Sequence, residues 1–461
     1  MHELSNLSLW HATMSAEEWG PGRSALGSDL QVDVAIVGAG YTGLWTAYYL
    51  LQRDPTLRVA ILESQVVGFG ASGRNGGWCS ALLPMGLDAI AKQSSREQAV
   101  RLQTVMHETV AEVGRVVAAE GIDCHFAHGG YLNISRNPMQ LQREREHIEH
   151  LHSYGFTDDD YRVLSQSEAA ERLAATNVLG GGFTPHCAAI HPARLARGLA
   201  RTVEGLGATI YEHTPVLEIT PRTVRTHLGT VKADVVVRAT EAFTPSLAGE
   251  GRSVAPIYSL MIATEPLPND FWESVGLHDR ATFNDGRHMI IYGQRTADNR
   301  FAFGGRGAWY HWGSAIKPQY DRDERVHGLI HETLRELFPA IGDAAITHRW
   351  GGPVGAARDW WCHASYDQAT GLASAGGYVG DGVGTTNLSG RTLADLITGE
   401  PSELTTLPWV GHRSRKWEPE PLRFIGINAT TVLPVGADRH EDRKGKSSKW
   451  REAIMNRLLG H

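Results

Sequence analysis

Three glycine-rich segments have the residue types and spacing needed to hold a dinucleotide. The first reads Gly38-Ala39-Gly40-Tyr41-Thr42-Gly43 and lies between a short apolar run at residues 32–37 and a helical pattern. In such a segment the first glycine allows a tight turn, the second lets a pyrophosphate approach the backbone, and the third lets the helix pack closely on the strand. The helix N-terminus offers N–H groups and partial positive charge to the phosphates. We therefore predict a pyrophosphate site at residues 38–43.

A carboxylate at the end of the next expected strand suits the same ligand. Residues 58–62 form a second short apolar run, and Glu63 follows it, twenty residues beyond Gly43. A carboxylate in this position can accept hydrogen bonds from the ribose hydroxyls of an adenosine. Together these elements predict one Rossmann-type β-α-β unit, which by itself fits either NAD or FAD.

The second and third glycine-rich segments favour FAD. Residues 67–77 are too rich in glycine to begin a helix by propensity, and they suit a backbone that runs flat against a large planar ligand. Residues 376–386 form another glycine-rich turn that leads into a helix. One helix N-terminus can serve the pyrophosphate, and the other can face the pyrimidine edge of an isoalloxazine ring, where negative charge gathers on reduction. Two distant sites fit an elongated FAD, with NAD kept as an alternative.

The order and spacing of the three segments resemble the D-amino-acid oxidase/glycine oxidase superfamily of FAD-dependent oxidoreductases. The strings GASGRNGG and GYVGDGVGTTNLSGRTLADLI are most similar to its gamma-glutamylputrescine oxidase-like branch. Residues 233–245 resemble the third strand of the family's FAD domain, and residues 191–200 resemble its central helix. Members often carry glycine or asparagine where this chain has Glu241, which is a departure from the pattern.

The resemblance, which covers about residues 30–400, implies an α/β fold (α+β overall) with two interleaved domains. A Rossmann-type FAD-binding domain is expected to alternate along the chain with a substrate domain built on an antiparallel sheet, for which residues 256–306 show the alternating pattern. The expected boundaries are an N-terminal tail at 1–30, an FAD-binding domain at 31–95, 155–245 and 350–400, a substrate domain at 96–154 and 246–349, and a C-terminal extension at 401–461.

FAD is expected to be bound without a covalent link. In the sarcosine oxidase branch a cysteine carries the flavin, but Cys362 is offset from that position, and Cys79 is the next candidate. Both are expected to be buried bystanders. The residues predicted to bind the cofactor are Gly38, Ala39, Gly40, Tyr41, Thr42, Gly43, Glu63, Ser64, Gly70, Ala71, Ser72, Gly73, Arg74, Asn75, Gly76, Gly77, Val216, Ala239, Thr240, Gly380, Gly382, Val383, Gly384, Thr385 and Thr386.

Residues for the substrate are expected on the strands that roof the flavin. Each arginine among them could hold a carboxylate, tune the flavin or have a structural role. The aromatic run at residues 309–312 could line a site for a bulky or cationic substrate, or belong to the core. The candidates for the reaction site are Arg74, Tyr258, Met261, Tyr292, Arg295 and Arg306.

The expected activity is oxidation of an amine or amino acid, with hydride transfer to the flavin and hydrolysis of the imine. Oxygen is the expected electron acceptor, and no catalytic base is assigned. A dehydrogenase of the same fold that reduces a quinone or a protein remains an alternative. A second alternative is a non-catalytic flavin-binding protein whose C-terminal extension docks a partner.

Composition narrows the class of protein further. The net charge of −7 argues against a nucleic-acid partner. The four cysteines are widely spaced without a C-x-x-C pair, and no signal peptide or long apolar run is visible, so a cytoplasmic location is expected. The spacing of His186, Cys187 and His191 does not match a zinc site, and no metal is expected. Residues 446–461 are expected to form a solvated basic helix.

Overall fold

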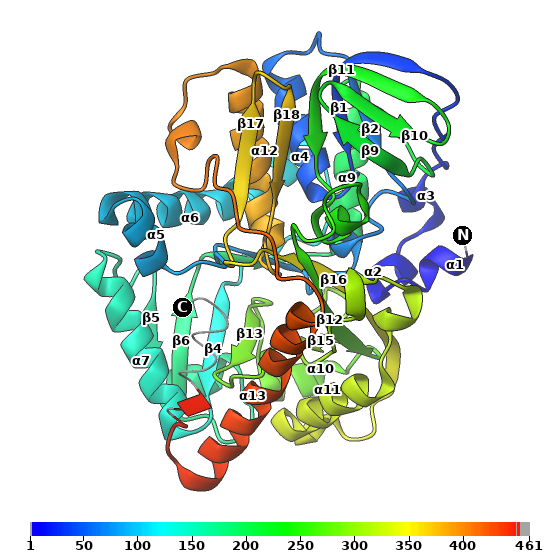
Figure 1. The fold of residues 1–461 in the computed structure, drawn as a ribbon. Helices are drawn as coiled ribbons and strands as arrows, with labels where there is room; N and C mark the ends of the chain where they lie inside the picture. Colours follow the sequence, from blue (N-terminus) through cyan, green and yellow to red (C-terminus); the bar gives the residue numbers. More distant parts are fainter. Residues whose placement is uncertain (1, 449, 452–461) are drawn as a thin grey trace.

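Two eight-stranded sheets form the two halves of the protein (Figure 1). The computed structural model describes residues 2–448, 450 and 451, so most of the predicted helix at 446–461 lies outside the described residues. Within this part of the chain, no helix is both long and apolar enough to cross a membrane. The first sheet consists of β17 (His363–Asp367), β18 (Leu372–Gly376), β11 (Thr230–Arg238), β1 (Leu30–Val37), β2 (Val59–Leu62) and β8 (Thr209–Tyr211), with the ribbon β9 (Val216–Thr220) and β10 (Thr223–Thr226) joined to β11.

The centre of the first sheet is parallel and buried on both faces. Strand β1 pairs in parallel with β2 and with β11. Because side chains alternate along a strand, Val34 and Ile36 pack on one face while Ala35 and Val37 pack on the other. The first face is covered by α4 (Tyr41–Arg53), α9 (Pro192–Gly205), α12 (Gly382–Thr398) and α6 (Arg96–Ala119), and the second by the β9–β10 ribbon. The predicted Rossmann-type unit is therefore confirmed.

The second sheet carries the lower half of the molecule in Figure 1. Its strands, in order, are β16 (Ile346–Ala356), β12 (Ala255–Thr264), β15 (Phe301–Gly305), β14 (Ile291–Arg295), β13 (Thr282–Asp285), β4 (Tyr131–Ser135), β6 (Gly180–Thr184) and β5 (Arg162–Leu164). All neighbours pair antiparallel except β13 and β4. The predicted antiparallel sheet is confirmed.

Helices and a small third sheet complete the fold. Strands β3 (Trp78–Ser80) and β7 (Cys187–Ala189) form a two-stranded sheet beside the second half. The second sheet and its edge strands pack against α7 (Pro138–Ser153), α8 (Gln166–Arg172), α10 (Asn269–Val275) and α11 (Glu324–Leu337). The remaining helices are α1 (His2–Ser5), α2 (Leu9–Ala12), α3 (Ala16–Trp19), α5 (Leu87–Gln93) and α13 (Leu422–Lys444).

The predicted boundaries between the two halves need three corrections. The segment 155–245 was assigned wholly to the FAD-binding domain, but β5 and β6 within it pair in the second sheet. The segment 96–154 was assigned to the substrate domain, but its helix α6 packs against α12 in the core of the first half. The segment 350–400 is predicted to belong to the FAD-binding domain, but its first residues lie in β16, which is a strand of the second sheet. Local patterns identify a strand or helix, whereas the sheet or core that receives it depends on distant residues.

The N-terminal segment is not a surface tail. Leu9 and Trp10 of α2 are almost fully buried and pack in a cluster with Met261 and Trp350. The Trp10 indole donates a hydrogen bond of 2.8 Å to the carbonyl of Asn75. The short helices are thus a fixed part of the structure beneath the second glycine-rich segment.

Helices α4 and α12 cross closely because a glycine lies at their contact. A Cβ atom at Gly390 would lie 2.7 Å from the carbonyl carbon of Trp45, well inside normal contact. Trp45 itself is fully buried. This close approach fixes the relative position of two helices whose N-termini both face the same cavity.

We expect Gly390→Ala to lower the free energy of unfolding by about 2 kcal/mol, because the added methyl group must push the two helices apart. Gly328→Ala is the matched control, since Gly328 lies inside α11 and a Cβ there meets no atom within 4 Å. That change should stabilise the protein by about 0.5–1 kcal/mol through helix propensity. Denaturant unfolding measures both, and equal effects of the two substitutions would contradict the close crossing.

Candidate functional site

An elongated cavity of about 230 Å³ opens at the carboxyl ends of β1, β2 and β11. In open α/β sheets this edge is where ligands bind. The predicted cofactor residues that line the cavity are Gly38, Gly40, Tyr41, Thr42, Glu63, Ser64, Gly70, Ala71, Ser72, Asn75, Val216, Ala239, Thr240, Gly380, Gly382, Val383 and Thr386. The fold thus brings together residues from all three glycine-rich segments. We call this space the cofactor cavity.

The N-terminus of α4 faces the cofactor cavity, and its N-cap residue makes no side-chain hydrogen bond. Gly40 is its N-cap residue, and the Tyr41 N–H donates 2.9 Å to the Ser72 hydroxyl. Gly38 has a φ of +109°, and a Cβ atom there would lie 2.6 Å from the Ala239 carbonyl oxygen, so no other residue fits this turn without a shift. The helix end therefore keeps N–H groups and partial positive charge for an anion.

Glu63 ties the end of β2 to the glycine turn. Its Oε2 accepts the Ala39 N–H at 2.9 Å, and its Oε1 accepts the Gln65 N–H at 2.9 Å. Burial raises the pKa of the Glu63 carboxyl, and these backbone hydrogen bonds oppose the rise. A carboxylate held here, at the cavity wall, has the acceptor chemistry that ribose hydroxyls require.

The N-terminus of α12 faces the same cavity at its other end. The N-cap residue is Asp381, and in the described structure no side chain caps this helix either. Gly380 before it has a φ of +111°, and the atom nearest to an added Cβ would be Arg306 Nη2 at 3.5 Å. The two uncapped helix ends that the sequence predicted thus meet one continuous space, as a molecule with the length of FAD needs.

Six predicted cofactor residues line neither this cavity nor the one described next. A Cβ at Gly77 would lie 2.0 Å from Gln294 Nε2, and one at Gly384 would lie 2.5 Å from the Ser80 carbonyl oxygen. At these positions glycine serves close packing behind the cavity wall, which a sequence cannot distinguish from contact with a ligand. The six residues are Ala39, Gly43, Gly73, Gly77, Gly384 and Thr385.

A second cavity, of about 260 Å³, continues from the first. The residues that line both are Ala71, Asn75, Val354, Gly380 and Val383. We call the second space the substrate cavity, because it lies between the α12 N-terminus and the second sheet. Its walls include the aromatic side chains of Trp78, Tyr131 and Tyr292 and the polar side chains of Arg74, Asn284, Ser259, Arg306 and Asp381.

Three of the six predicted reaction-site residues lie elsewhere. Side chains alternate along a strand, so Ser259 of β12 reaches the substrate cavity while Tyr258 points to the opposite face, toward Tyr320. Met261 packs against the N-terminal cluster instead. Arg295 hydrogen-bonds to Asn299 and stacks over Trp272 at 4.7 Å. Arg74, Tyr292 and Arg306 do line the cavity.

The two arginines of the substrate cavity differ in their partners. The Arg74 Nη1 group lies 2.7 Å from Asp321 and 3.2 Å from the Gly351 carbonyl, so its charge is compensated. Burial raises the pKa of Asp321, and Arg74 opposes that rise. Arg306 donates to the Val379 carbonyl at 3.0 Å and forms no ion pair with the carboxylates that the structure describes. Arg306 is therefore the better candidate to meet an anion.

Asp381 is a site residue that sequence reasoning missed. It is the one carboxylate among the described residues that line the substrate cavity. Burial raises the pKa of Asp381 to about 6, and the positive charge of Arg306 opposes the rise. Its place inside the third glycine-rich segment was the available signal, but only the fold shows that this residue borders both helix end and cavity.

Glu241, a departure from the family pattern, lines the cofactor cavity. Its Oε2 accepts the Gly355 N–H at 2.6 Å, whereas its buried Oε1 has no hydrogen-bond partner among the described residues. Burial raises the pKa of Glu241 to about 7, and the backbone N–H groups around it oppose this. Glu241 thus places a buried carboxyl in the wall of the cofactor cavity.

The two cysteines considered for covalent attachment are fully buried and line neither cavity. The Cys362 sulfur lies 3.6 Å from the Met85 sulfur. Burial raises the pKa of both the Cys79 and the Cys362 thiol, so neither offers a thiolate. The geometry supports FAD held by non-covalent contacts.

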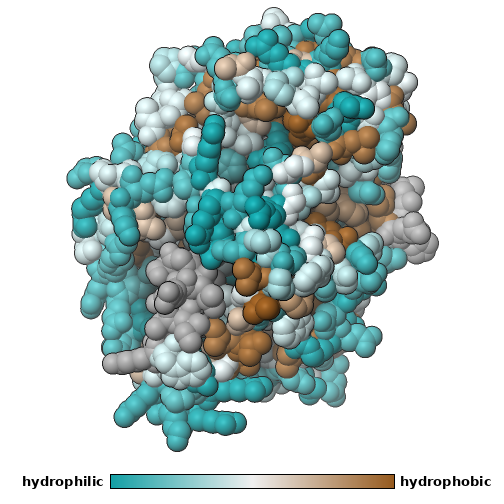
Figure 2. All heavy atoms as spheres, in the orientation of Figure 1, coloured by the Kyte–Doolittle hydropathy of each residue, from teal (hydrophilic) through white to brown (hydrophobic). Residues whose placement is uncertain are grey.

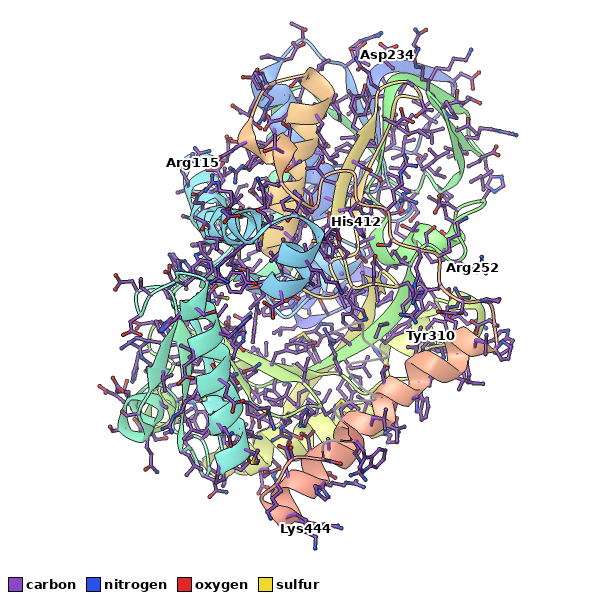
Figure 3. All side chains as sticks on the ribbon, turned by 60° about the vertical axis from the view of Figure 1, so that its left-hand side comes forward. Arg115, Asp234, Arg252, Tyr310, His412 and Lys444 are labelled. Carbon is purple, nitrogen blue, oxygen red and sulfur yellow. The ribbon has the colours of Figure 1, made fainter. Side chains whose placement is uncertain are left out.

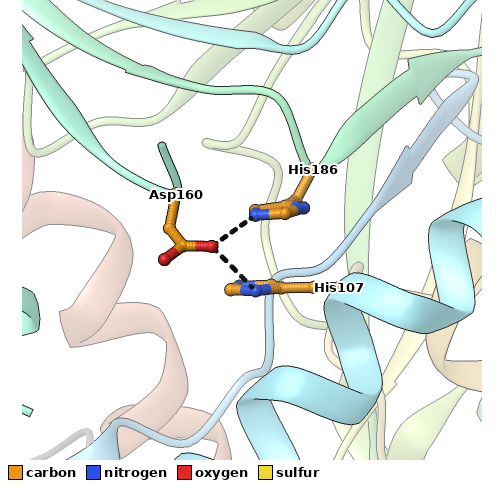
Figure 4. Close-up of side chains that lie close together, drawn as sticks. All are labelled: His107, Asp160 and His186. Atoms are coloured by element: carbon orange, nitrogen blue, oxygen red, sulfur yellow. Dashed lines mark hydrogen bonds and ion pairs between the residues drawn. The ribbon is translucent and has the colours of Figure 1, made fainter. Parts of the chain in front are cut away.

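His186, Cys187 and His191, which the sequence analysis considered for a metal, do not form a group of possible ligands among the described residues. His186 instead meets His107 and Asp160, which together form a cluster (Figure 4). His186 Nε2 lies 3.0 Å from the Asp160 carboxylate, and the two imidazole rings stack at 3.6 Å with an angle of 4°. Parallel rings direct their nitrogens side by side rather than at a common point. The arrangement suits a hydrogen-bonded pair better than a tetrahedral ion site.

Comparison with known proteins identifies the class that this fold and cavity define. The family model described as FAD dependent oxidoreductase matches residues 33–396. The chain therefore belongs to this family of FAD-dependent oxidoreductases, and its cofactor is FAD rather than NAD. The match spans both sheets, which confirms the resemblance drawn from the three glycine-rich segments.

Several relatives are similar over most of their length. The gamma-glutamylputrescine oxidoreductase of Escherichia coli strain K12 is 30% identical over 404 residues, which cover 84% of this chain and 88% of that protein. A probable oxidoreductase OrdL of Rhizobium meliloti strain 1021 is 31% identical over 385 residues, which cover 82% of this chain and 85% of that protein. The crystal structure of glycine oxidase from Geobacillus kaustophilus has a TM-score of 0.70 at 21% identity and covers 84% of this chain and all of that one, so it shares the fold.

We expect Gly40→Val to abolish FAD binding. The new side chain would enter the space at the α4 N-terminus, where the pyrophosphate is expected, and would meet the Ser72 hydroxyl 3.0 Å from its Cβ. Cys79→Ser is the control and should keep its FAD, because that thiol lines neither cavity. The flavin absorbance per mole of purified protein measures both. Equal FAD in wild type and Gly40→Val would refute this placement of the phosphates.

Glu241→Gln should stabilise the FAD-free protein at high pH. The carboxyl titrates near 7 in the folded protein and near 4.5 when unfolded, so wild type loses stability as the pH rises between these values. A neutral glutamine avoids this loss, which amounts to about 3 kcal/mol above pH 8. Unfolding at pH 5 and pH 8 tests this, with the exposed Glu332→Gln as control. If the free energies of unfolding of Glu241→Gln and wild type differ by the same amount at both pH values, Glu241 does not titrate with a raised pKa in the folded protein.

Proposed function

We propose that the protein oxidises an amine or amino acid at the carbon that bears the nitrogen. The observation that carries the proposal is the substrate cavity, which opens into the cofactor cavity at the α12 N-terminus and combines aromatic walls with one carboxylate, Asp381. Aromatic faces and a carboxylate are complementary to an ammonium group. The names of two relatives, gamma-glutamylputrescine oxidoreductase and glycine oxidase, support the same substrate class.

FAD, when bound, would supply the two-electron chemistry that the oxidation needs. The C–H bond beside the nitrogen breaks with its electron pair, while the nitrogen lone pair forms a C=N bond. Water then hydrolyses the imine to a carbonyl compound and releases the amine nitrogen. Only a neutral amine has the free lone pair that this step needs, although an alkylamine with a pKa like that of lysine, ~10.4, is protonated at neutral pH.

Asp381 is the group on this chain best placed to take the extra proton. Its carboxylate attracts the ammonium form, and transfer of one proton to Asp381 Oδ turns two charged groups into two neutral ones, which a buried cavity favours. Burial raises the pKa of the hydroxyls of Tyr131 and Tyr292, so neither is a competing base. Arg306 then lies free to orient a negative group of the substrate.

Oxygen is proposed as the electron acceptor. The names of solved neighbours with this fold include both a glycine oxidase and an L-proline dehydrogenase, so the fold serves either kind of acceptor. Hydrogen peroxide formed in stoichiometric amount when air reaches the reduced enzyme supports oxygen. Reoxidation by a quinone, with negligible peroxide in air, would favour the dehydrogenase.

We expect the rate of anaerobic flavin reduction at limiting amine to rise with pH and then level off. Asp381→Asn, which has nearly the same shape, should slow reduction strongly at pH 7 and much less at pH 10, where free amine is plentiful. Stopped-flow absorbance of the flavin measures both profiles. The proposal fails if no amine or amino acid bleaches the flavin while an alcohol or hydroxy acid does, or if amines react fastest at low pH.

A further inference from the structure

A third cavity, of about 330 Å³, lies between α11, α13 and the adjoining ends of β14 and β15. Much of its wall is apolar, including Met289, Ile330 and Val435. Hydrophobic side chains are also visible on the face of the molecule that carries α13 (Figure 2). Four guanidinium groups complete the wall, and the described lining contains no carboxylate. The four are Arg287, Arg306, Arg325 and Arg439. We call this space the arginine cavity.

Among the described contacts, only one of the four guanidinium groups of the arginine cavity forms an ion pair. Arg287 is paired with Asp285, whose two carboxylate oxygens lie 2.7 and 2.8 Å from the Arg287 Nε. The Arg325 Nη2 contacts only the Gly307 carbonyl, at 3.5 Å, among its described hydrogen-bond partners. Arg306 likewise uses a carbonyl, that of Val379. Apolar walls with unpaired guanidinium groups suit an anion attached to an apolar chain.

Helix α13, which forms the outer wall, is held in place by specific polar contacts. Near its N-terminal end, the Asn428 side chain accepts the Tyr310 N–H at 2.9 Å, and Figure 3 shows Tyr310 beside this part of the helix, with Lys444 at the far end. Toward its C-terminal end, Asp438 accepts the N–H groups of His288 and Met289 at 2.7 and 2.9 Å. The helix lies beyond residue 396, where the family match ends.

The arginine cavity adjoins the substrate cavity. Ile291 and Arg306 line both spaces, because they lie at the paired ends of β14 and β15. Arg306 also contacts the turn before Asp381 through the Val379 carbonyl.

We propose that the arginine cavity binds an anionic end of the substrate, so that the substrate is an amine joined by an apolar chain to a carboxylate. This proposal rests on the proposed amine oxidation. The amine lies in the substrate cavity, the chain passes Ile291, and the carboxylate meets Arg325 and Arg439. Helix α13 thereby determines specificity for an end of the substrate that takes no part in the reaction.

The test compares ω-amino acids, from ω-aminobutanoate to ω-aminodecanoate, with their methyl esters as anaerobic reductants of the FAD-loaded enzyme. In this series at least one carboxylate should bind about tenfold more tightly than its ester, as expected for a hydrogen bond between charged groups. Arg325→Gln and Arg439→Gln should each raise the Kd of that carboxylate about tenfold, with little change for the ester or in the limiting rate of reduction. Arg335→Gln is the matched control, since Arg335 is an exposed arginine of α11 outside the cavity.

Equal Kd values for acid and ester, or equal effects of the Gln variants on both, would overturn the proposal. Calorimetric titration with the amine-free octanoate separates it from the proposed function. If no amine reduces the flavin but octanoate binds and Arg325→Gln weakens that binding, the anionic site stands and amine oxidation fails. If amines reduce the flavin but the Kd of octanoate and of every ω-amino acid is unchanged in Arg325→Gln and Arg439→Gln, amine oxidation stands and the anionic site fails.

Discussion

The structure depends on one constraint, the convergence of two uncapped helix N-termini on a single cavity. Helices α4 and α12 are separated by more than 300 residues in the chain, yet they cross at Gly390 closely enough to exclude a Cβ atom. Their exposed N–H groups and partial positive charges therefore act on the same ligand from two places. Neither N-cap residue makes a side-chain hydrogen bond. Apart from the Tyr41 N–H, which the Ser72 hydroxyl accepts, the described side chains leave these donors to a cofactor with negative charge at both its phosphates and its reduced ring.

Buried carboxylates line the cofactor cavity, which includes Glu63 and Glu241, and the adjoining substrate cavity, which includes Asp381. Glu63, Glu241 and Asp381 all have a raised pKa, chiefly because burial disfavours the charged form. Their chemistry is complementary to that of the helix ends, because they accept hydrogen bonds from hydroxyl or ammonium groups. The cavity therefore contains donors for anions and acceptors for polar hydrogens in separate places, which fixes the direction in which an elongated molecule can lie.

The second sheet decides which side chains meet the reacting end of that molecule. Alternation along β12 and β14 directs Ser259 and Tyr292 into the substrate cavity and turns Tyr258 and Arg295 away. The position of the second sheet also determines the wall between the substrate cavity and the arginine cavity, because Ile291 and Arg306 at the strand ends line both spaces. Chemistry near the flavin and recognition of the substrate's far end can thus change separately within one fold.

The sequence by itself determined the local features. Glycine spacing predicted the first turn, the β-α-β unit and the second helix N-terminus, because each depends on backbone geometry within a few residues. It also predicted most residues that line the cofactor cavity. A glycine needed for a ligand and one needed for packing leave the same signal, however, and the close packing around Gly77 and Gly384 is visible only in the structure.

Only the tertiary structure decided what depends on contacts between distant segments. Strands β5 and β6 pair in the second sheet, and α2 packs beneath the second glycine-rich segment. The local sequence could not show either, because the partners of these elements lie far along the chain. The face on which Tyr258 or Arg295 lies follows from strand register, which a single sequence leaves open. The positions of Asp381 and Glu241 in the cavities, and of α13 over the arginines, depend in the same way on the packing of segments separated by hundreds of residues.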